Sequence, residues 1–238
     1  MTGQRKYGQG CPVAHALDLV GDRWALLVVR ELRLGPRRFG DLAGALPGIA
    51  PSVLTQRLAD LVHVGVLQRL SLAGSTRPEG YGLTAWGADL EPVFVALARW
   101  GARSPVVPLE GPISDDAVML GIRTFFPAAS GTLAGAVTVA PGRSQAGADR
   151  TPSSVLVTLE HERYLLVLTD GSLTSLVRLT AGDPTPVPDA AVHSDADTLR
   201  ALLVGSATPA EVLAVGSVGI SGDETLARAV LDAMARRR

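Results

Sequence analysis

One stretch, residues 47–61 (PGIAPSVLTQRLADL), constrains the fold of this chain more than any other. Its apolar residues recur at the spacing of one face of a helix, and this pattern predicts an amphipathic helix. The apolar residues are Ile49, Val53, Leu54, Leu58 and Leu61. The polar face carries Ser52, Thr55, Gln56 and Arg57. Short polar groups and a fork-shaped donor suit the major groove of DNA, while an ordinary surface helix is the alternative on this stretch alone.

Charge is divided unevenly along the 238 residues, whose net charge is −1. Residues 1–105 carry 12 basic and 8 acidic side chains, whereas residues 106–238 carry 10 basic and 15 acidic ones. This asymmetry indicates that only the first half meets a polyanion. A proline-rich stretch from Ser104 to Pro112 separates the halves. We therefore predict a domain over 1–105, a linker over 106–112 and a second domain over 113–238.

Composition excludes several classes of protein. Hydrophobic residues make up 47% of the chain, which is enough for packed cores. No apolar run approaches the length of a membrane span, and the N-terminus lacks the apolar region of a signal peptide. The single cysteine fits a reducing compartment. We expect a cytoplasmic protein with no membrane partner.

The first half predicts a helix-turn-helix followed by a wing. Apolar stripes that end at glycines predict helices over 12–20 and 21–35, and a shorter one over 37–46 precedes the 47–61 stretch. Beyond it, residues 64–72 and 81–84 alternate like two strands of a β-hairpin.

A long helix is predicted from Thr84 to about Arg103. Its apolar side includes Phe94, Leu97 and Trp100. This side is too large for a terminal helix in water, so we expect a two-fold partner to cover part of it.

Six phrases of this half occur in the order and spacing of a known family. They are Cys11-Pro12, GDRW at 21–24, LGPRRFGDL at 34–42, the 47–61 stretch, VGVLQR at 64–69 and YGLTAWG at 81–87. Together they resemble the HxlR-type winged-helix transcriptional regulators over residues 8–103. The resemblance implies a homodimer on double-stranded operator DNA. It also implies that Ser52, Thr55, Gln56 and Arg57 face the bases, while Arg37, Arg38 and Arg77 reach phosphates.

Cys11 allows two interpretations. In some relatives a cysteine at this place senses oxidants, and a thiolate near the start of a helix is more reactive than usual. The alternative is a small packing residue at a dimer seam.

The second half mixes helices and strands. A helix is predicted over 114–126 with Ser114 as its N-cap, and its two first-turn acids are read as helix N-terminal charge. Strands are predicted over 132–140, 153–160, 163–170 and 172–180, the last three as an antiparallel meander. Capping patterns at Ser194 and Thr208 predict a helix pair, and a short strand and a final helix close the chain.

This order resembles the sterol carrier protein type-2-like domain over residues 113–236. The overall prediction is therefore an α+β protein, with an N-terminal winged helix-turn-helix and a C-terminal sterol-carrier-like antiparallel sheet covered by helices. The resemblance implies an apolar tunnel for a small hydrophobic ligand, and ordinary core packing is the alternative for each lining residue. The candidates are Phe125, Phe126, Leu165, Val167, Leu199, Leu202 and Leu203.

Signals for an enzyme are poor. The chain has no phosphate-binding loop and no dinucleotide fingerprint, and its four histidines lack the spacing of metal ligands. We expect no catalytic residues, no cofactor and no metal. The leading interpretation is a ligand-responsive, dimeric DNA-binding regulator. The alternative is a lipid or polyketide carrier whose winged-helix half serves dimerisation or protein contact.

Overall fold

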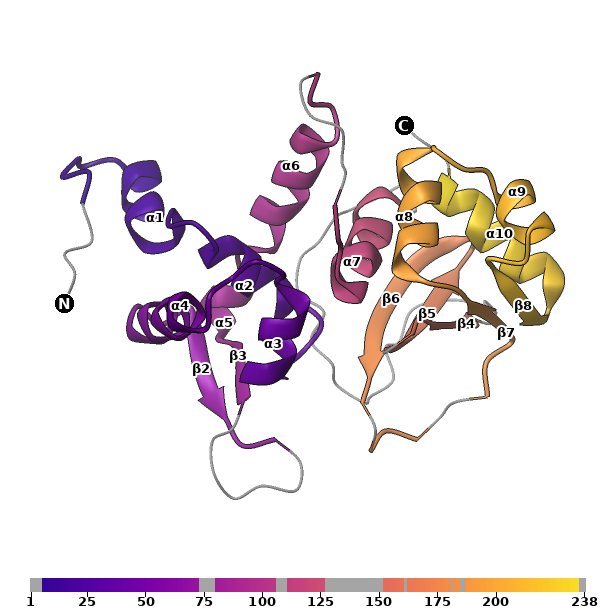
Figure 1. Cartoon of the computed structure of the whole chain (residues 1–238), viewed down its shortest axis with the longest axis horizontal. Coiled ribbons are helices and arrows are strands. Elements are labelled where there is room, and N and C mark those ends of the chain that lie inside the picture. Colours follow the sequence, from indigo (N-terminus) through magenta and orange to yellow (C-terminus); the bar gives the residue numbers. More distant parts are fainter. Residues whose placement is uncertain are drawn as a thin grey trace. The chain divides into compact units, whose positions relative to one another are not determined.

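The computed structural model describes residues 6–72, 80–105, 111–126, 152–160, 162–180, 182–184 and 187–235. The chain divides into two compact units, Met1–Phe94 and Val95–Arg238 (Figure 1). Each unit has its own apolar core. We call them the N-terminal unit and the C-terminal unit.

The N-terminal unit is built on four helices whose leucines and valines meet in one core. The helices are α1 (Pro12–Val20), α2 (Ala25–Glu31), α3 (Phe39–Ala45) and α4 (Pro51–His63). Val28, Leu42 and Leu54 are fully buried in the shared cluster. The predicted helices at 12–20, 21–35, 37–46 and 47–61 are all present, although α2 and α3 are shorter than predicted and α4 begins at Pro51 and continues to His63. Proline supplies the first turn of α1 and α4, where its missing N–H leaves no hydrogen bond unmade.

A small antiparallel sheet forms the wing. Its strands are β1 (Arg37–Arg38), β2 (Leu67–Leu70) and β3 (Gly80–Leu83), in the order β1-β3-β2. A Cβ added at Gly80 would lie 2.6 Å from Leu72, and one added at Gly82 would lie 2.6 Å from Leu70. The two glycines therefore let the leucine side chains cover β3 closely.

The long helix predicted over 84–103 is in fact two helices, α5 (Ala85–Ala88) and α6 (Glu91–Gly101). Thr84 caps α5 by accepting a hydrogen bond from the Gly87 N–H at 3.0 Å. Pro92 explains the break, because its ring would clash with the carbonyl of residue 88 in a continuous helix and it has no N–H to donate. The prediction was wrong because it weighed the apolar stripe and ignored this proline.

The C-terminal unit has a five-stranded sheet in the order β6-β5-β4-β7-β8. Its elements are α7 (Asp115–Phe125), β4 (Ser153–Thr158), β5 (Arg163–Thr169), β6 (Ser172–Leu179), β7 (Ala190–His193), α8 (Ala196–Val204), α9 (Pro209–Ala214), β8 (Gly219–Gly222) and α10 (Glu224–Ala235). The predicted meander is confirmed in β4, β5 and β6, which pair antiparallel. The strand predicted over 132–140 lies outside the described residues.

The sheet is mixed rather than antiparallel, since β7 pairs parallel with β4. Strand β7 was missed because four residues with one β-branched side chain carry almost no strand signal. It lies between β4 and the edge strand β8, which pairs antiparallel with it. Pairing with β4 and β8, rather than local sequence preference, therefore stabilises this strand.

The two predicted capping patterns had different outcomes. At α9, Thr208 accepts from the Glu211 N–H while the Glu211 carboxylate accepts from the Thr208 N–H, as predicted. At α8 the cap is Asp195, whose carboxylate accepts from the Thr198 N–H at 2.6 Å. The predicted cap, Ser194, instead donates to the Ser217 carbonyl.

Helices α7, α8 and α10 cover one face of the C-terminal sheet (Figure 1). Alternate residues of β5 are buried on this side, namely Tyr164, Leu166 and Leu168. Because side chains alternate along a strand, Leu165 and Val167 lie on the opposite face, where they are half-buried.

Candidate functional site

Helix α4 has an exposed row of side chains, which are small or uncharged except for one histidine. Its buried side is formed by Leu54, Leu58 and Leu61, which anchor the helix to the core. Four exposed residues follow one another at spacings of four, three and four, which places them in line along the helix. They are Ser52, Gln56, Ala59 and His63, and we call them the α4 ridge.

Polar side chains on this ridge and next to it are oriented by hydrogen bonds within α4. The Thr55 hydroxyl donates to the Pro51 carbonyl at 2.9 Å, and the Gln56 amide nitrogen donates to Asp60 at 2.7 Å. A glutamine amide keeps a second N–H and its carbonyl oxygen. Gln56 therefore still offers one donor and one acceptor to a base edge. Ser52, Thr55 and Gln56 are all exposed, as contact with bases requires.

Arg57 lies differently from the prediction that it faces bases. Its guanidinium is hydrogen-bonded to Asp22, between α1 and α2, and forms a second ion pair with Asp60 at 3.1 Å. Only 18% of the Arg57 side chain is exposed. This Asp22–Arg57–Asp60 network, which we call the α4 clamp, ties the helix to the α1–α2 corner.

Val53 also lies differently from its prediction, because it does not belong to the buried stripe. It is 38% exposed, whereas Leu54 beside it is fully buried. The predicted apolar stripe therefore included one residue too many, Val53. At 100° per residue, positions 54, 58 and 61 already fill the buried side of the helix.

The three arginines expected at phosphates have different surroundings. Arg37 is 7% exposed and Arg38 is exposed, on adjacent residues of β1. Tyr81 of β3 is opposite Arg37 in β1 and Arg69 in β2, and the Arg69 guanidinium lies 5.7 Å from the Tyr81 ring centroid. Arg37 is largely buried here, and its expected contact with a phosphate stays a prediction. Arg77 lies outside the described residues.

An apolar surface is exposed along α6. Val93, Leu97 and Trp100 are spaced four and three apart, and Trp100 is 72% exposed. Phe94 was predicted to join them at a dimer interface, but it is buried in the core under the Arg33 guanidinium, 4.6 Å away. Arg33 also binds both carboxylate oxygens of Glu91, at 2.7 and 2.5 Å.

Helix α1 also exposes apolar side chains, Val13 and Leu17. Cys11 precedes this helix and is exposed. The backbone N–H groups of Ala14 and Val13 stabilise its thiolate and hold the pKa of the thiol below its ordinary value. This geometry is compatible with the redox interpretation of Cys11 and does not test it.

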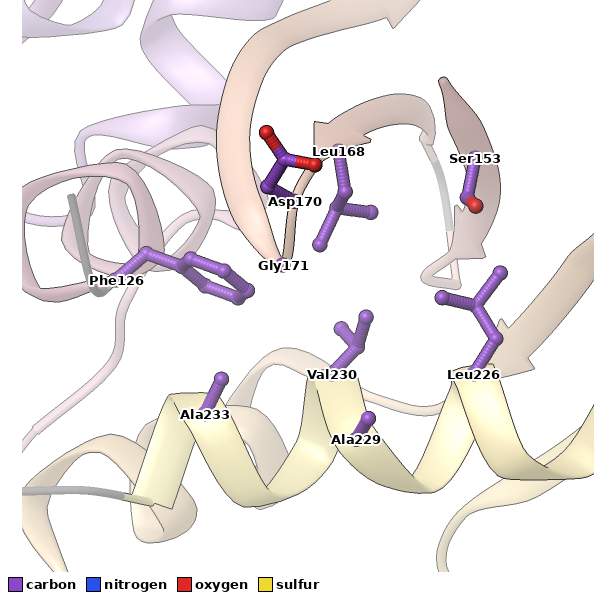
Figure 2. A pocket seen from close by; sticks show the side chains of 9 residues that line it. All are labelled: Phe126, Ser153, Leu168, Asp170, Gly171, Leu226, Ala229, Val230 and Ala233. Carbon is purple, nitrogen blue, oxygen red and sulfur yellow. The ribbon is translucent and has the colours of Figure 1, made fainter. Parts of the chain in front are cut away.

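The C-terminal unit contains a cavity of about 110 Å³ between α10, the end of α7 and the sheet, which we call the α10 cavity. Figure 2 shows Phe126 pointing into it opposite Val230 and Ala233, while Asp170 and Gly171 close one side. Asp170 and Gly171 form the β5–β6 turn, both with positive φ, as two-residue hairpins require. The remaining lining residues are Ser153, Leu168, Leu226 and Ala229.

The structure does not bring the seven predicted tunnel residues together. Only Phe126 lines the α10 cavity. Leu199 and Leu202 are fully buried in the core, whereas Phe125 is exposed and Leu203 is half-buried. Leu165 and Val167 lie on the other face of the sheet. The hydrophobic pattern located the sheet and helices but not the cavity.

A buried ionic cluster holds α7 on the sheet, and the sequence analysis missed it. Asp116 accepts a hydrogen bond from the Tyr164 hydroxyl at 2.7 Å and from Arg178 at 2.5 Å. Burial, followed by the Asp116 charge, raises the pKa of Tyr164. Asp116 lies in the first turn of α7, as predicted, and its carboxylate also serves this cluster. Arg178, a charged residue at an inward-facing position of β6, was the available signal.

Metal and membrane sites were sought in the same residues. Among the described parts of the chain, no three histidine, cysteine, aspartate or glutamate residues gather where they could hold a metal ion. No helix within these ranges is long and apolar enough to cross a membrane.

Comparison with known proteins places the N-terminal unit. The model of the HxlR-like helix-turn-helix family matches residues 19–105. A Synechocystis protein, "Uncharacterized HTH-type transcriptional regulator sll1512", is 39% identical over 95 residues, which are 40% of this chain and 70% of that protein. The chain belongs to the HxlR-like helix-turn-helix family. Residues 19–105 are hereafter the HxlR-like domain.

Two further relatives extend the comparison. The Mycobacterium bovis "Uncharacterized HTH-type transcriptional regulator Mb3122" is 44% identical over 93 residues, which are 39% of this chain and 58% of that protein. The reduced form of the B. subtilis transcriptional regulator YodB is 29% identical, with a TM-score of 0.37 over 41% of this chain and 97% of that one.

Proposed function

We propose that this chain is a transcriptional regulator that binds operator DNA through α4. The α4 ridge carries this proposal, because it is a row of exposed side chains without any acidic group, on a helix anchored by three buried leucines. The relatives are named transcriptional regulators, which supports the same function. In this proposal Ser52, Thr55 and Gln56 face the bases. Arg38 and Arg77 contact phosphates, and Arg57 holds the helix in place.

The proposed regulator is a homodimer. The exposed row Val93, Leu97 and Trp100 on α6 supports this, because an aromatic side chain beside aliphatic ones is a favourable part of an interface. Val13 and Leu17 of α1 add exposed apolar surface. Two copies of α4 would then read two half-sites of a palindromic operator.

The C-terminal unit, in this proposal, is a sterol-carrier-like module that binds a small hydrophobic ligand in the α10 cavity. Phe126, Leu168 and Val230 supply the apolar lining that supports it. The cavity is smaller than the roughly 300–1,000 Å³ of sites for drug-sized ligands, so a short acyl or aryl group fits better than a sterol. Ligand binding would change DNA affinity only through different affinity for two states of the protein.

The DNA-binding proposal is tested by selecting sequences from a random duplex library with the full chain. We expect enrichment of a palindromic sequence, bound at least a hundredfold more tightly than random DNA at moderate salt. Arg38→Ala should weaken operator and random DNA alike and flatten the salt dependence by about one unit. Weak, sequence-blind binding would instead favour the alternative function, a carrier whose winged-helix half serves dimerisation or protein contact.

The ligand-binding part is tested with short-chain fatty acids as probes. Hexanoic or decanoic acid should raise the melting temperature of the C-terminal unit in the full chain and shift its affinity for the operator. Ala233→Phe fills the cavity and should remove both effects without changing ligand-free DNA binding. Leu203→Phe, which lies against Gly121 outside the cavity lining, is the control. No response to either acid, together with no co-purified ligand in native mass spectrometry, would contradict this part alone.

A further inference from the structure

Val53 is an exposed aliphatic side chain in the first turn of α4. Pro51 is the first residue of the helix, which makes Val53 the third. It is 38% exposed, although its neighbour Leu54 is fully buried. In a helix-turn-helix the N-terminal residues of the recognition helix contact base edges. Val53 therefore occupies the part of α4 that meets DNA in the proposed function.

The rotation of α4 about its axis is fixed, so the exposure of Val53 is not incidental. The buried Leu54 and Leu58 hold one side of the helix, and the α4 clamp holds the side of Arg57. Val53 lies next to Gln56 and Arg57, three and four residues on. Turning Val53 into the core would therefore require breaking both attachments.

The clamp also changes what the first two turns of α4 can recognise. Arg57 is the one charged residue of the segment 51–58, and its guanidinium is bound to Asp22 and Asp60. An engaged guanidinium is a poor reader of guanine, which arginine contacts with both of its outer nitrogens. The groups left on this surface are the hydroxyl of Ser52, the side chain of Thr55, the amide of Gln56 and the methyl groups of Val53.

In the major groove, thymine alone presents a methyl group, and glutamine pairs with the N6 and N7 atoms of adenine. Val53 and Gln56 are neighbours on the helix, so the two preferences coincide. We propose that Val53 is a specificity-determining residue that packs against the 5-methyl group of a thymine in each half-site. This inference rests on the proposed DNA-binding function. It adds which base pair is recognised, because the bases beneath the first turn of α4 then include an A·T pair.

The experiment removes single methyl groups from the DNA. In the duplex selected by the full chain, each thymine is replaced in turn by deoxyuridine, which pairs identically but lacks the methyl. For the wild-type protein, one position per half-site should lose about fourfold in affinity, the value of one buried methyl group. Val53→Ala should bind the thymine and uracil duplexes with equal affinity at that position, as measured by fluorescence anisotropy.

Val215→Ala is the matched control, since it makes the same change at an exposed position of the C-terminal unit. It should keep the full sensitivity to uracil. The inference is overturned if no uracil position weakens the wild-type protein, or if Val53→Ala retains the fourfold loss. If the library yields no preferred sequence at all, the DNA-binding function fails, and this inference fails with it.

Discussion

The two units of this chain differ in how deeply they bury the ion pairs that join separate elements. In the HxlR-like domain, the pairs Asp22–Arg57 and Arg33–Glu91 each keep one partner partly exposed, Asp22 at 47% and Glu91 at 29%. In the C-terminal unit, Asp116 and Arg178 are both buried, and Tyr164 completes their hydrogen bonds. The first arrangement orients helices at the surface, whereas the second joins α7 to the sheet through the interior.

This difference has an energetic consequence. A buried charge whose partner is removed is strongly destabilising, while an exposed ion pair contributes little to stability. Substitutions in the C-terminal cluster should therefore unfold that unit. Substitutions in the ion pairs of the HxlR-like domain should leave the fold intact and change the orientation of α4 and α6.

Asp116→Ala should produce the largest loss of stability. It leaves Arg178 buried without its carboxylate partner, and the free energy of unfolding of the C-terminal unit should fall by about 3–5 kcal/mol. Urea denaturation followed by circular dichroism measures this. Glu224→Ala, which breaks an exposed pair with Arg228, is the control and should change stability by less than about 0.5 kcal/mol. Similar losses for both variants would remove the contrast between interior and surface pairs.

Trp100→Glu should disrupt assembly without unfolding either unit. The substitution places a charge within the proposed α6 interface, which should weaken dimerisation by about 2–4 kcal/mol. Sedimentation velocity should show monomers at concentrations where the wild-type protein is dimeric. Val215→Glu, at an exposed valine of the C-terminal unit, should sediment like the wild type. A dimeric Trp100→Glu protein would place the interface elsewhere.

Gly87→Ala tests a close backbone approach inside the HxlR-like domain. A Cβ at this position would lie 2.1 Å from the Val66 carbonyl oxygen, so α5 must move away from the wing. We expect a loss of about 1–3 kcal/mol in the unfolding of this domain. Gly44→Ala, a helical glycine with open space around it, should instead be neutral or slightly stabilising. Equal melting temperatures for Gly87→Ala and wild type would show that the approach is not constraining.

Asp22→Asn should have the smallest effect on stability, about 0.5 kcal/mol, but an informative effect on DNA binding. If the α4 clamp positions the helix, the substitution weakens operator binding and leaves the ratio of specific to non-specific affinity nearly unchanged. If Arg57 reads a base, releasing it from Asp22 tightens operator binding. Fluorescence anisotropy on operator and random duplexes distinguishes the two directions.

Much of the HxlR-like domain was predictable because its signals are local. Gly21 caps the end of α1, prolines begin α1 and α4, and a leucine stripe defines α4. The errors arose where other residues of the domain determine how a segment folds or which way a side chain points. Pro92 breaks the last helix in two, and Phe94 turns into the core beneath Arg33 instead of toward a partner. Arg37 and Arg38 have adjacent places in sequence, yet the wing buries one and exposes the other.

The candidate sites were less predictable than the elements that carry them. Alternation along β5 showed which residues share a face, but it could not say which face the helices cover. Six of the seven predicted ligand contacts therefore fall outside the α10 cavity. The cavity is assembled from segments as distant as Phe126, Leu168 and Val230, whose approach depends on how α7 and α10 pack on the sheet.

The sequence by itself determined the helix-turn-helix, the meander of β4, β5 and β6, and the caps of α7 and α9. Each of these depends on contacts within a few residues, which spacing and capping chemistry express directly. Only the tertiary structure decided that β7 inserts parallel to β4, that Asp116 meets Arg178 inside the C-terminal unit, and that Asp22 captures Arg57. Partners in these contacts are separated by 35 residues or more, and the energy of an ion pair or strand pairing depends on burial and register that no local pattern records.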